Sequence, residues 1–413
     1  MTENKKIKIE KIISDGRGLG RSERMTYLIE KSVPGEIVAI KEEIKKKSYV
    51  ECKISSIEEE SLNRTIPVCP YYDSCGGCDL QHIKVSAHKE IKTQILKELL
   101  KKNAKIEFND EISYFEKSFF NYRNKITLKI DGDRVGLLQE KSNRLVEIDE
   151  CLICCADINK ILKDLKSKVS PDNRISRAVI KNSAFNKTLI AFYTDYSAED
   201  KLPKFMADIN ADSIIAVLKD KSAVFLKGNG SLADIIDGKS FAYSYSTFMQ
   251  VNLEILQVLV SYMRKNLIRG NSLLDLYSGV GLYSIIFHDL FKDVVSVEGN
   301  KSSIHFQRKN LKDNKISNVN AVSKFIDDKL FIEKNAFDTC IIDPPREGVP
   351  PLALKHIFNS VKDTVIYISC DGATLSRDLK LISGSAFKIK NIAVFDMFPN
   401  TIHFETVVIL ERE

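Results

Sequence analysis

The chain has 413 residues, of which 29% are charged and 44% hydrophobic, a balance typical of a globular protein with two or three domains. No stretch reaches the roughly 18 uncharged apolar residues that a membrane span needs, and the charged N-terminus MTENKKIKIEK lacks the apolar core of a secretory signal. We therefore expect a cytoplasmic protein. The net charge of +6 is compatible with a nucleic-acid partner but does not establish one.

Residues 1–60 alternate short strand-like runs with glycine-containing turns. The runs are Lys6–Ile13, Thr26–Ile29 and Val50–Ile57. Several short strands joined by regular turns predict a small β-barrel, and the arrangement resembles a TRAM domain, an OB-like RNA-binding barrel. Arg17, Arg21 and Lys45–Lys47 can face phosphates, but acidic residues nearly balance the basic ones, so a solvated surface is an equal alternative.

Three cysteines follow within ten residues, Cys69, Cys75 and Cys78 in CPYYDSCGGC. In a reducing cytosol, clustered cysteines indicate metal binding or catalysis rather than disulfides. A fourth ligand is needed, and the candidates are Cys151, Cys154 and Cys155. Zinc and an iron–sulfur cluster both accept four cysteines, and the spacing does not separate them.

The segment Ile83–Lys105 predicts an amphipathic helix with an apolar face that includes Ile91 and Ile95. Its opposite face is rich in lysine: Lys84, Lys89, Lys92, Lys97, Lys101, Lys102 and Lys105. Such a face is usually solvated, and it can also approach an RNA backbone.

The middle of the chain, residues 110–240, alternates further strand candidates with one clear helix, Ile158–Lys168. The strand candidates are Ile126–Ile130, Arg134–Leu138, Leu145–Ile148, Ala178–Lys181, Thr188–Tyr193, Ile214–Leu218 and Ala223–Lys227. This pattern predicts an antiparallel sheet with helices on one side. Arg123 and Lys125 are the candidate RNA contacts here, with ordinary surface as the stronger alternative.

The last part begins with a predicted helix, Leu253–Leu267, and then a strand, a glycine turn and a helix: Ser272–Tyr277, Ser278–Gly281 and Leu282–Phe291. This order is typical of the nucleotide-binding start of a doubly wound fold. The next strand, Val294–Val297, ends in Glu298, about twenty residues after Gly279, where an acid can accept hydrogen bonds from ribose hydroxyls. A glycine turn and an acid fit either NAD or S-adenosylmethionine.

The predicted strand Phe337–Ile342 runs into Asp343-Pro-Pro-Arg346. Two prolines make this loop extended and rigid, so it can hold Asp343 and Arg346 over the edge of the sheet. The element is typical of methyltransferases that act on planar amine or base groups, and it points away from a dehydrogenase.

Two further chemical groups lie at predicted strand ends. Cys370 follows the buried strand Val365–Ile368 and precedes a helical pattern, where the helix N-terminus favours a thiolate; a small buried core cysteine is the alternative. Ala393–Phe398 predicts the next strand. Glu405 then stands alone before the apolar strand Thr406–Leu410, where burial would raise its pKa and suit proton transfer; a surface Glu on an edge strand is the alternative.

Taken together, SCDGATLSRDL, DMFPNTIHFE, CPYYDSCGGC, DPPR and TFMQVN make the chain similar to the RNA uracil-5-methyltransferases, most closely to the branch that methylates bacterial 23S ribosomal RNA. The resemblance covers nearly the whole chain. It implies a monomeric enzyme that methylates C5 of a uridine in RNA with S-adenosylmethionine. The alternatives are the tRNA branch, which typically lacks the barrel and the cysteine cage, and a non-catalytic RNA-binding assembly factor.

The resemblance also implies domains and site residues. The domains would be a TRAM-like barrel (1–60), a central α+β domain with an iron–sulfur cluster (61–240) and a Rossmann-like α/β methyltransferase domain (241–413). Cys370 would be the nucleophile and Glu405 the base. The contacts to S-adenosylmethionine would be Gln250, Tyr277, Gly279, Gly281, Glu298 and Asp343. A 4Fe-4S cluster, with structural zinc as the alternative, would be held by Cys69, Cys75, Cys78 and Cys151, because the family places its fourth cysteine directly after a short acidic strand such as VEIDEC.

The sequence departs from the family pattern at a few positions. Gly372 stands where the family usually has Pro, which predicts a looser loop after Cys370, and Asp371 replaces a frequent Asn. Tyr277 and Ser278 stand where Phe and Cys are common. Cys154 and Cys155 are additional cysteines. None of these departures removes a catalytic group.

Overall fold

The computed structural model describes residues 5–330 and 332–413. The N-terminal part is a closed five-stranded barrel in the order β1-β2-β3-β5-β4, which confirms the predicted barrel. Its strands are β1 (Lys6–Ile12), β2 (Gly18–Ser22), β3 (Met25–Ile29), β4 (Ile37–Lys45) and β5 (Val50–Glu59). Gly20 allows β2 to approach β1 closely, because a Cβ there would lie 2.4 Å from the Lys8 carbonyl oxygen.

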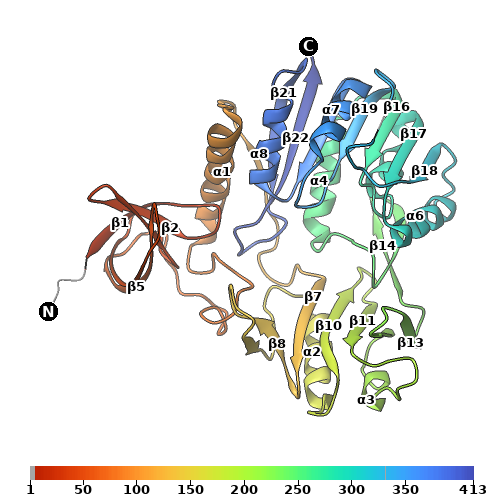
Figure 1. Ribbon diagram of the computed structural model, residues 1–413. Helices are drawn as coiled ribbons and strands as arrows, with labels where there is room; N and C mark the ends of the chain where they lie inside the picture. Colours follow the sequence, from red (N-terminus) through yellow and green to blue (C-terminus); the bar gives the residue numbers. More distant parts are fainter. Residues whose placement is uncertain (1–4, 331) are drawn as a thin grey trace.

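The predicted lysine-rich helix is divided into three pieces: a short turn η1 (Val85–Ala87), helix α1 (His88–Leu99) and a π-helical turn η2 (Leu100–Ala104). In Figure 1, α1 stands between the barrel and the C-terminal part of the chain. The assignment of Lys92 to a solvated face is wrong: its side chain is fully buried. Lys92 lies one residue after Ile91, so helical periodicity alone does not separate it from the apolar face.

The central part is a seven-stranded sheet in the order β13-β12-β11-β10-β7-β8-β9 (Figure 1). Its strands are β7 (Lys125–Asp131), β8 (Arg134–Leu138), β9 (Leu145–Glu147), β10 (Ile175–Asn182), β11 (Thr188–Thr194), β12 (Ser213–Val217) and β13 (Ala223–Lys227), and its helices are α2 (Ala156–Lys168) and α3 (Lys204–Ala207). Strands β11 and β12 are parallel, so the prediction of a purely antiparallel sheet is wrong. The apolar face of α2 packs on this sheet in one core.

The C-terminal part is an eight-stranded sheet in the order β18-β17-β16-β19-β20-β22-β21-β6. The strands are β6 (Ser113–Phe115), β16 (Gly270–Leu276), β17 (Phe291–Glu298), β18 (Val319–Ser323), β19 (Phe337–Ile342), β20 (Val361–Ser369), β21 (Phe387–Phe395) and β22 (Glu405–Arg412). The neighbouring pairs are parallel except those that β22 makes with β20 and β21. A two-stranded ribbon, β14 (Ser231–Ile236) and β15 (Lys239–Ser244), lies between β13 and β16 in the chain.

Helices cover both faces of the eight-stranded sheet, which confirms the doubly wound α/β architecture. One core contains apolar residues of α1, α7 (Pro351–Ser360) and α8 (Gly372–Leu381), and the other contains those of α4 (Leu253–Asn266) and α5 (Leu282–Ile286) together with Leu311 of α6 (Lys301–Asp313). β6 comes from the middle of the chain and adds to the C-terminal sheet beside β21.

Some predicted boundaries are wrong in this part. The helix predicted over Leu282–Phe291 ends at Ile286, a short 3-10 turn η3 (His288–Leu290) follows, and Phe291 already begins β17. The strand predicted to reach Phe398 ends at Phe395. No helix in the described part of the chain is long and apolar enough to cross a membrane.

Candidate active site

Cys370 lies between the end of β20 and the start of α8, as the sequence predicts. Asp371 caps α8, since its carboxylate accepts a 2.8 Å hydrogen bond from the Thr374 amide. The helix begins at Gly372, where a Cβ would lie 2.9 Å from Leu99 Cδ1 of α1. The close packing of α1 therefore gives a physical reason for glycine at this position.

Glu405 faces the same edge of the sheet as Cys370. Ser369, the last residue of β20, pairs with Thr406 of β22 in antiparallel register. Cys370 follows Ser369 and Glu405 precedes Thr406, so both lie at the same end of this strand pair, close enough for the Glu405 charge to act on the thiol. Glu405 is buried, and β22 lies between β20 and β21, so the alternative of an exposed glutamate on an edge strand is wrong.

Burial controls the protonation of this pair. Desolvation raises the pKa of the Cys370 thiol to about 11, and the nearby Glu405 carboxylate adds to the shift. Desolvation likewise raises the pKa of Glu405 well above its usual range, with a further contribution from Asp343. The expectation that the start of α8 favours a thiolate therefore meets an opposing effect, because burial favours the neutral thiol.

Arg346 supplies the opposing charge. The positive charge of its guanidinium lowers the pKa of the Cys370 thiol and that of Glu405. The loop is held in place because the Arg346 carbonyl oxygen accepts a 2.9 Å hydrogen bond from the Thr374 hydroxyl of α8. The Asp-Pro-Pro-Arg element thus brings a cation to Cys370, which offsets only part of the effect of desolvation on the pKa of the thiol.

Two acids and a tyrosine lie behind this pair. Asp343 follows β19, and desolvation raises its pKa, while the Tyr283 hydroxyl of α5 lowers it. Asp275, inside β16, is fully buried and accepts a 2.8 Å hydrogen bond from the Ser284 amide. Desolvation raises the pKa of Asp275 to about 7. Among the described residues, neither the second carboxylate oxygen of Asp275 nor the Tyr283 hydroxyl has a partner within hydrogen-bond distance and angle. Two buried polar groups at this edge are therefore free to bind a ligand.

The residues predicted to contact S-adenosylmethionine lie along the carboxyl ends of neighbouring parallel strands. Glu298 ends β17, and its carboxylate accepts a 2.9 Å hydrogen bond from the Gly279 amide, which joins the predicted acid to the glycine turn. Tyr277 and Gly281 have φ values of 61° and 91°, so the chain turns sharply between β16 and α5. Gln250 is buried in the segment before α4, and its backbone carbonyl oxygen accepts a 3.1 Å hydrogen bond from the Asn124 side-chain amide.

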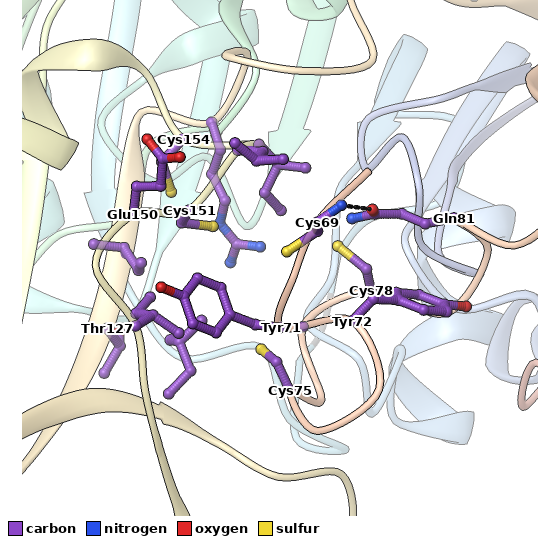
Figure 2. Close-up of a pocket in the computed structure, with 17 residues that line it drawn as sticks. Cys69, Tyr71, Tyr72, Cys75, Cys78, Gln81, Thr127, Glu150, Cys151 and Cys154 are labelled. Atoms are coloured by element: carbon purple, nitrogen blue, oxygen red, sulfur yellow. Dashed lines mark hydrogen bonds between the residues drawn. The ribbon is translucent and has the colours of Figure 1, made fainter. Parts of the chain in front are cut away.

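The predicted cysteine cage is a separate site, a cavity of about 180 Å³ between the cysteine segment and the central sheet. Figure 2 shows the thiols of Cys69, Cys75, Cys78 and Cys151 turned toward this cavity from two different stretches of chain. Within residues 5–330 and 332–413, no three or more His, Cys, Asp or Glu side chains are placed so that they could hold a metal ion. The structure thus groups the four predicted cysteines around one space, and the cluster itself stays a prediction.

The two additional cysteines have different surroundings. Hydrogen bonding from the Cys154 thiol lowers the pKa of Cys151, and Cys154 is itself fully buried at the cavity wall. Cys155 does not line the cavity. Arg123 lines it as well, and its guanidinium donates a 2.8 Å hydrogen bond to the Lys125 carbonyl oxygen. Arg123 therefore lies against the cysteines, and its role as an RNA contact stays a prediction.

Some groups at these sites were not expected from the sequence. The sequence does mark Asp275 as unusual, because it is an acid inside an otherwise apolar strand. Nothing in the sequence distinguishes Tyr283, because aromatic residues in a helix usually pack in a core, as this one also does. Asp79 was not expected either: its carboxylate accepts a 3.0 Å hydrogen bond from the Ile402 amide, shortly before Glu405.

Comparison with known proteins agrees with the fold and the site. The family model described as tRNA (Uracil-5-)-methyltransferase matches residues 85–413. An RNA methyltransferase of Thermotoga maritima is 29% identical over 98% of both chains, and the 23S rRNA (uracil(1939)-C(5))-methyltransferase RlmD of Legionella pneumophila is 27% identical over 98% of this chain and 96% of its own.

One solved structure is similar over almost the full length. The tRNA (uracil-54, C5)-methyltransferase of Pyrococcus abyssi, in complex with S-adenosyl-L-homocysteine, covers 99% of this chain and 100% of its own, with a TM-score of 0.79 and 26% identity. The similarity to this tRNA enzyme extends over the residues of the barrel, so, contrary to our expectation, the barrel does not count against the tRNA branch. Because the family model spans most of the sequence, the chain belongs to the tRNA (uracil-5-)-methyltransferase family.

Proposed function

We propose that this enzyme methylates C5 of a specific uridine in 23S ribosomal RNA, with Cys370 as the nucleophile and Glu405 as the base. Methylation of uracil C5 in RNA with S-adenosylmethionine follows from the family. The observation that carries the residue roles is the register of β20 and β22, which brings the thiol and the carboxyl to the edge where Asp343 and Glu298 also lie.

The chemistry requires both groups. Uracil C5 is a poor nucleophile until a thiolate adds to C6, which breaks the C5–C6 double bond and places an enolate next to C5. S-adenosylmethionine supplies the methyl group when bound. Glu405 then takes the proton from C5, the Cys370–C6 bond breaks, and the double bond is restored. Arg346 supports the first step, because its charge favours the thiolate form of Cys370.

The target base must leave its stack to reach Cys370, which is half-buried at the end of β20. The preference for 23S rRNA rests on relatives such as the Legionella RlmD. The tRNA substrate stays as the second candidate, because the Pyrococcus enzyme is similar over 99% of this chain.

The substrate assignment is tested by methyl transfer from tritiated S-adenosylmethionine to 23S rRNA and to tRNA, each isolated from a strain without this enzyme. We expect incorporation into 23S rRNA, and mapping of 5-methyluridine in that RNA then identifies the position. Incorporation into tRNA alone would contradict the rRNA assignment and leave the reaction intact. No incorporation into either RNA would contradict the proposed activity.

We further propose that Cys69, Cys75, Cys78 and Cys151 hold a 4Fe-4S cluster. Their thiols surround an open cavity rather than each other, which leaves room for a group larger than a single ion, and Arg123 at its wall offsets negative charge. The cluster would join the cysteine segment to the central sheet. An anaerobic preparation should be brown and contain iron and sulfide. Stoichiometric zinc in a colourless preparation would support the structural-zinc alternative instead.

A further inference from the structure

The loop between β21 and β22, residues 396–404, leads directly into Glu405 and is here called the base loop. A single lysine from another part of the chain reaches into it. Lys92 of α1 donates hydrogen bonds to the Asp396 carboxylate at 2.6 Å and to the His403 carbonyl oxygen at 3.1 Å, with the Phe398 carbonyl oxygen at 3.5 Å. An ammonium group has three donors, and all three of these acceptors belong to the base loop.

The contacts lie at both ends of the base loop. Asp396 directly follows β21, and His403 is two residues before Glu405. The second carboxylate oxygen of Asp396 accepts a 2.9 Å hydrogen bond from the Tyr114 hydroxyl, and the Asp396 amide donates to the Phe115 carbonyl oxygen at 2.8 Å. Strand β6 and helix α1 therefore hold the start of the loop, while Lys92 also holds its end.

Burial of the Lys92–Asp396 ion pair costs free energy, because both charged groups lose their contact with water. Both side chains are fully buried, and a buried ion pair is often no more stabilising than apolar residues of the same size. What a charged pair with defined hydrogen bonds adds is a fixed geometry for the backbone that it binds. Here that backbone belongs to the base loop.

We propose that Lys92 and Asp396 form a positioning pair that sets the place of the Glu405 carboxylate for proton removal from C5. This inference rests on the proposed function of Glu405. Cys370 lies on a different connection, between β20 and α8, so loss of the pair should leave addition to C6 largely intact and slow the later removal of the C5 proton. The methylated covalent adduct between Cys370 and the RNA should then accumulate.

The test uses the full-length enzyme with S-adenosylmethionine and RNA carrying tritium at uridine C5. Tritium release reports proton removal, and the fraction of protein that stays bound to RNA in denaturing gels reports the adduct. In Lys92→Met and Asp396→Asn we expect tritium release to fall on the order of 10- to 100-fold, as for a misplaced catalytic group, and the adduct fraction to rise. The rate of adduct formation should stay within about twofold.

A single variant leaves one buried charge without its partner and can fail to fold. In that case the double variant, Lys92→Met with Asp396→Leu, provides the test, because it replaces both charged groups by apolar ones. Lys181→Met is the matched control. Lys181 is another buried lysine that donates to backbone carbonyl oxygens, those of Ser244 and Thr247 at 2.7 and 2.8 Å, which do not belong to the base loop. Its removal should not raise the adduct fraction.

Glu405→Gln in the same assay separates the two levels of inference. If wild type forms no adduct and releases no tritium, the proposed function fails. The inference is overturned by a different result. In it, Glu405→Gln accumulates adduct, but the folded Lys92 and Asp396 variants show the same fold-decrease in the rate of adduct formation and in tritium release. The pair then has only a structural role.

Discussion

Cys370 and Glu405 lie at the same end of two hydrogen-bonded strands, next to the last register pair, Ser369 and Thr406. This relationship depends on β22 being inserted antiparallel between β20 and β21 in an otherwise parallel sheet. An antiparallel strand begins where its parallel neighbours end, so β22 delivers its first residue to the ligand-binding edge. Cys370 and Glu405, the proposed nucleophile and base, are therefore 35 positions apart in the sequence but share one edge.

Replacement of the nucleophile should stop the reaction at its first step. In Cys370→Ala there is no thiol to add to C6, so we expect neither methyl incorporation nor a denaturation-resistant RNA adduct. Incorporation of the tritiated methyl group and gel retention of labelled RNA measure the two outcomes. RNA affinity in a filter-binding assay should change little and serves as the folding control. Full activity of this variant would contradict covalent catalysis.

Replacement of the base should separate adduct formation from turnover. Glu405→Gln keeps the size of the side chain and removes its ability to accept the C5 proton, so we expect turnover to fall about 100- to 10,000-fold while the adduct accumulates. Single-turnover measurement of both quantities checks this prediction. Rapid turnover without adduct accumulation would mean that another group takes the proton.

The rate should rise with pH through the neutral and mildly alkaline range. Burial raises the pKa of Cys370 to about 11 and that of Glu405 well above its usual range, and both groups must lose a proton to act. At neutral pH only a minority of free enzyme is therefore in the reactive form. We expect kcat/KM to increase from pH 7 to pH 9, measured at constant ionic strength. A flat or falling profile over this range would contradict the requirement.

Arg346 should determine the pH range over which the activity of the enzyme rises. Its guanidinium lowers the pKa of Cys370 and Glu405, so Arg346→Ala removes the attraction and moves the rising limb of the adduct-formation profile to higher pH. Arg346→Lys keeps the charge but not the planar set of donors, so its profile should lie between the other two. Three superimposable profiles would show that Arg346 does not influence the thiol.

Local pattern was enough to predict much of the fold. The barrel, the strand Phe337–Ile342 and the glycine turn at the end of β16 follow from hydrophobic alternation and turn residues, and they are present. Such signals depend only on neighbours in the sequence. The spacing of Cys69, Cys75 and Cys78 indicated a shared site, and the family resemblance added Cys151. All four line one cavity, which Cys154 lines as well.

What could not be predicted depends on contacts between distant parts of the chain. Lys92 looks like one of many surface lysines until the base loop, about 300 residues away, is placed over it. The raised pKa of Cys370 has the same origin, since the sequence shows the start of a helix but not the burial by other segments that desolvates the thiol. The parallel pairing of β11 and β12 is likewise set by a chain crossover rather than by either strand's own pattern.

The buried acid Asp275 should make stability depend on pH in a predictable direction. Burial raises its pKa to about 7 in the folded protein, compared with about 3.9 in the unfolded chain. Between these two values the folded state binds more protons than the unfolded state. The contribution of this group is therefore fully present below about pH 4 and is lost as the pH rises through 7, with a total on the order of 4 kcal/mol.

Asp275→Asn removes the ionisation and keeps an oxygen for the Ser284 amide. We expect the variant to be less stable than wild type at pH 5, because its amide group has no partner at the position of the unpartnered oxygen, and to gain relative to wild type as the pH rises to 8. Urea unfolding at pH 5, 6, 7 and 8 measures both curves. The other buried acids are the same in both proteins, so the difference between the curves isolates Asp275. Parallel curves would show that Asp275 does not change its protonation in this range.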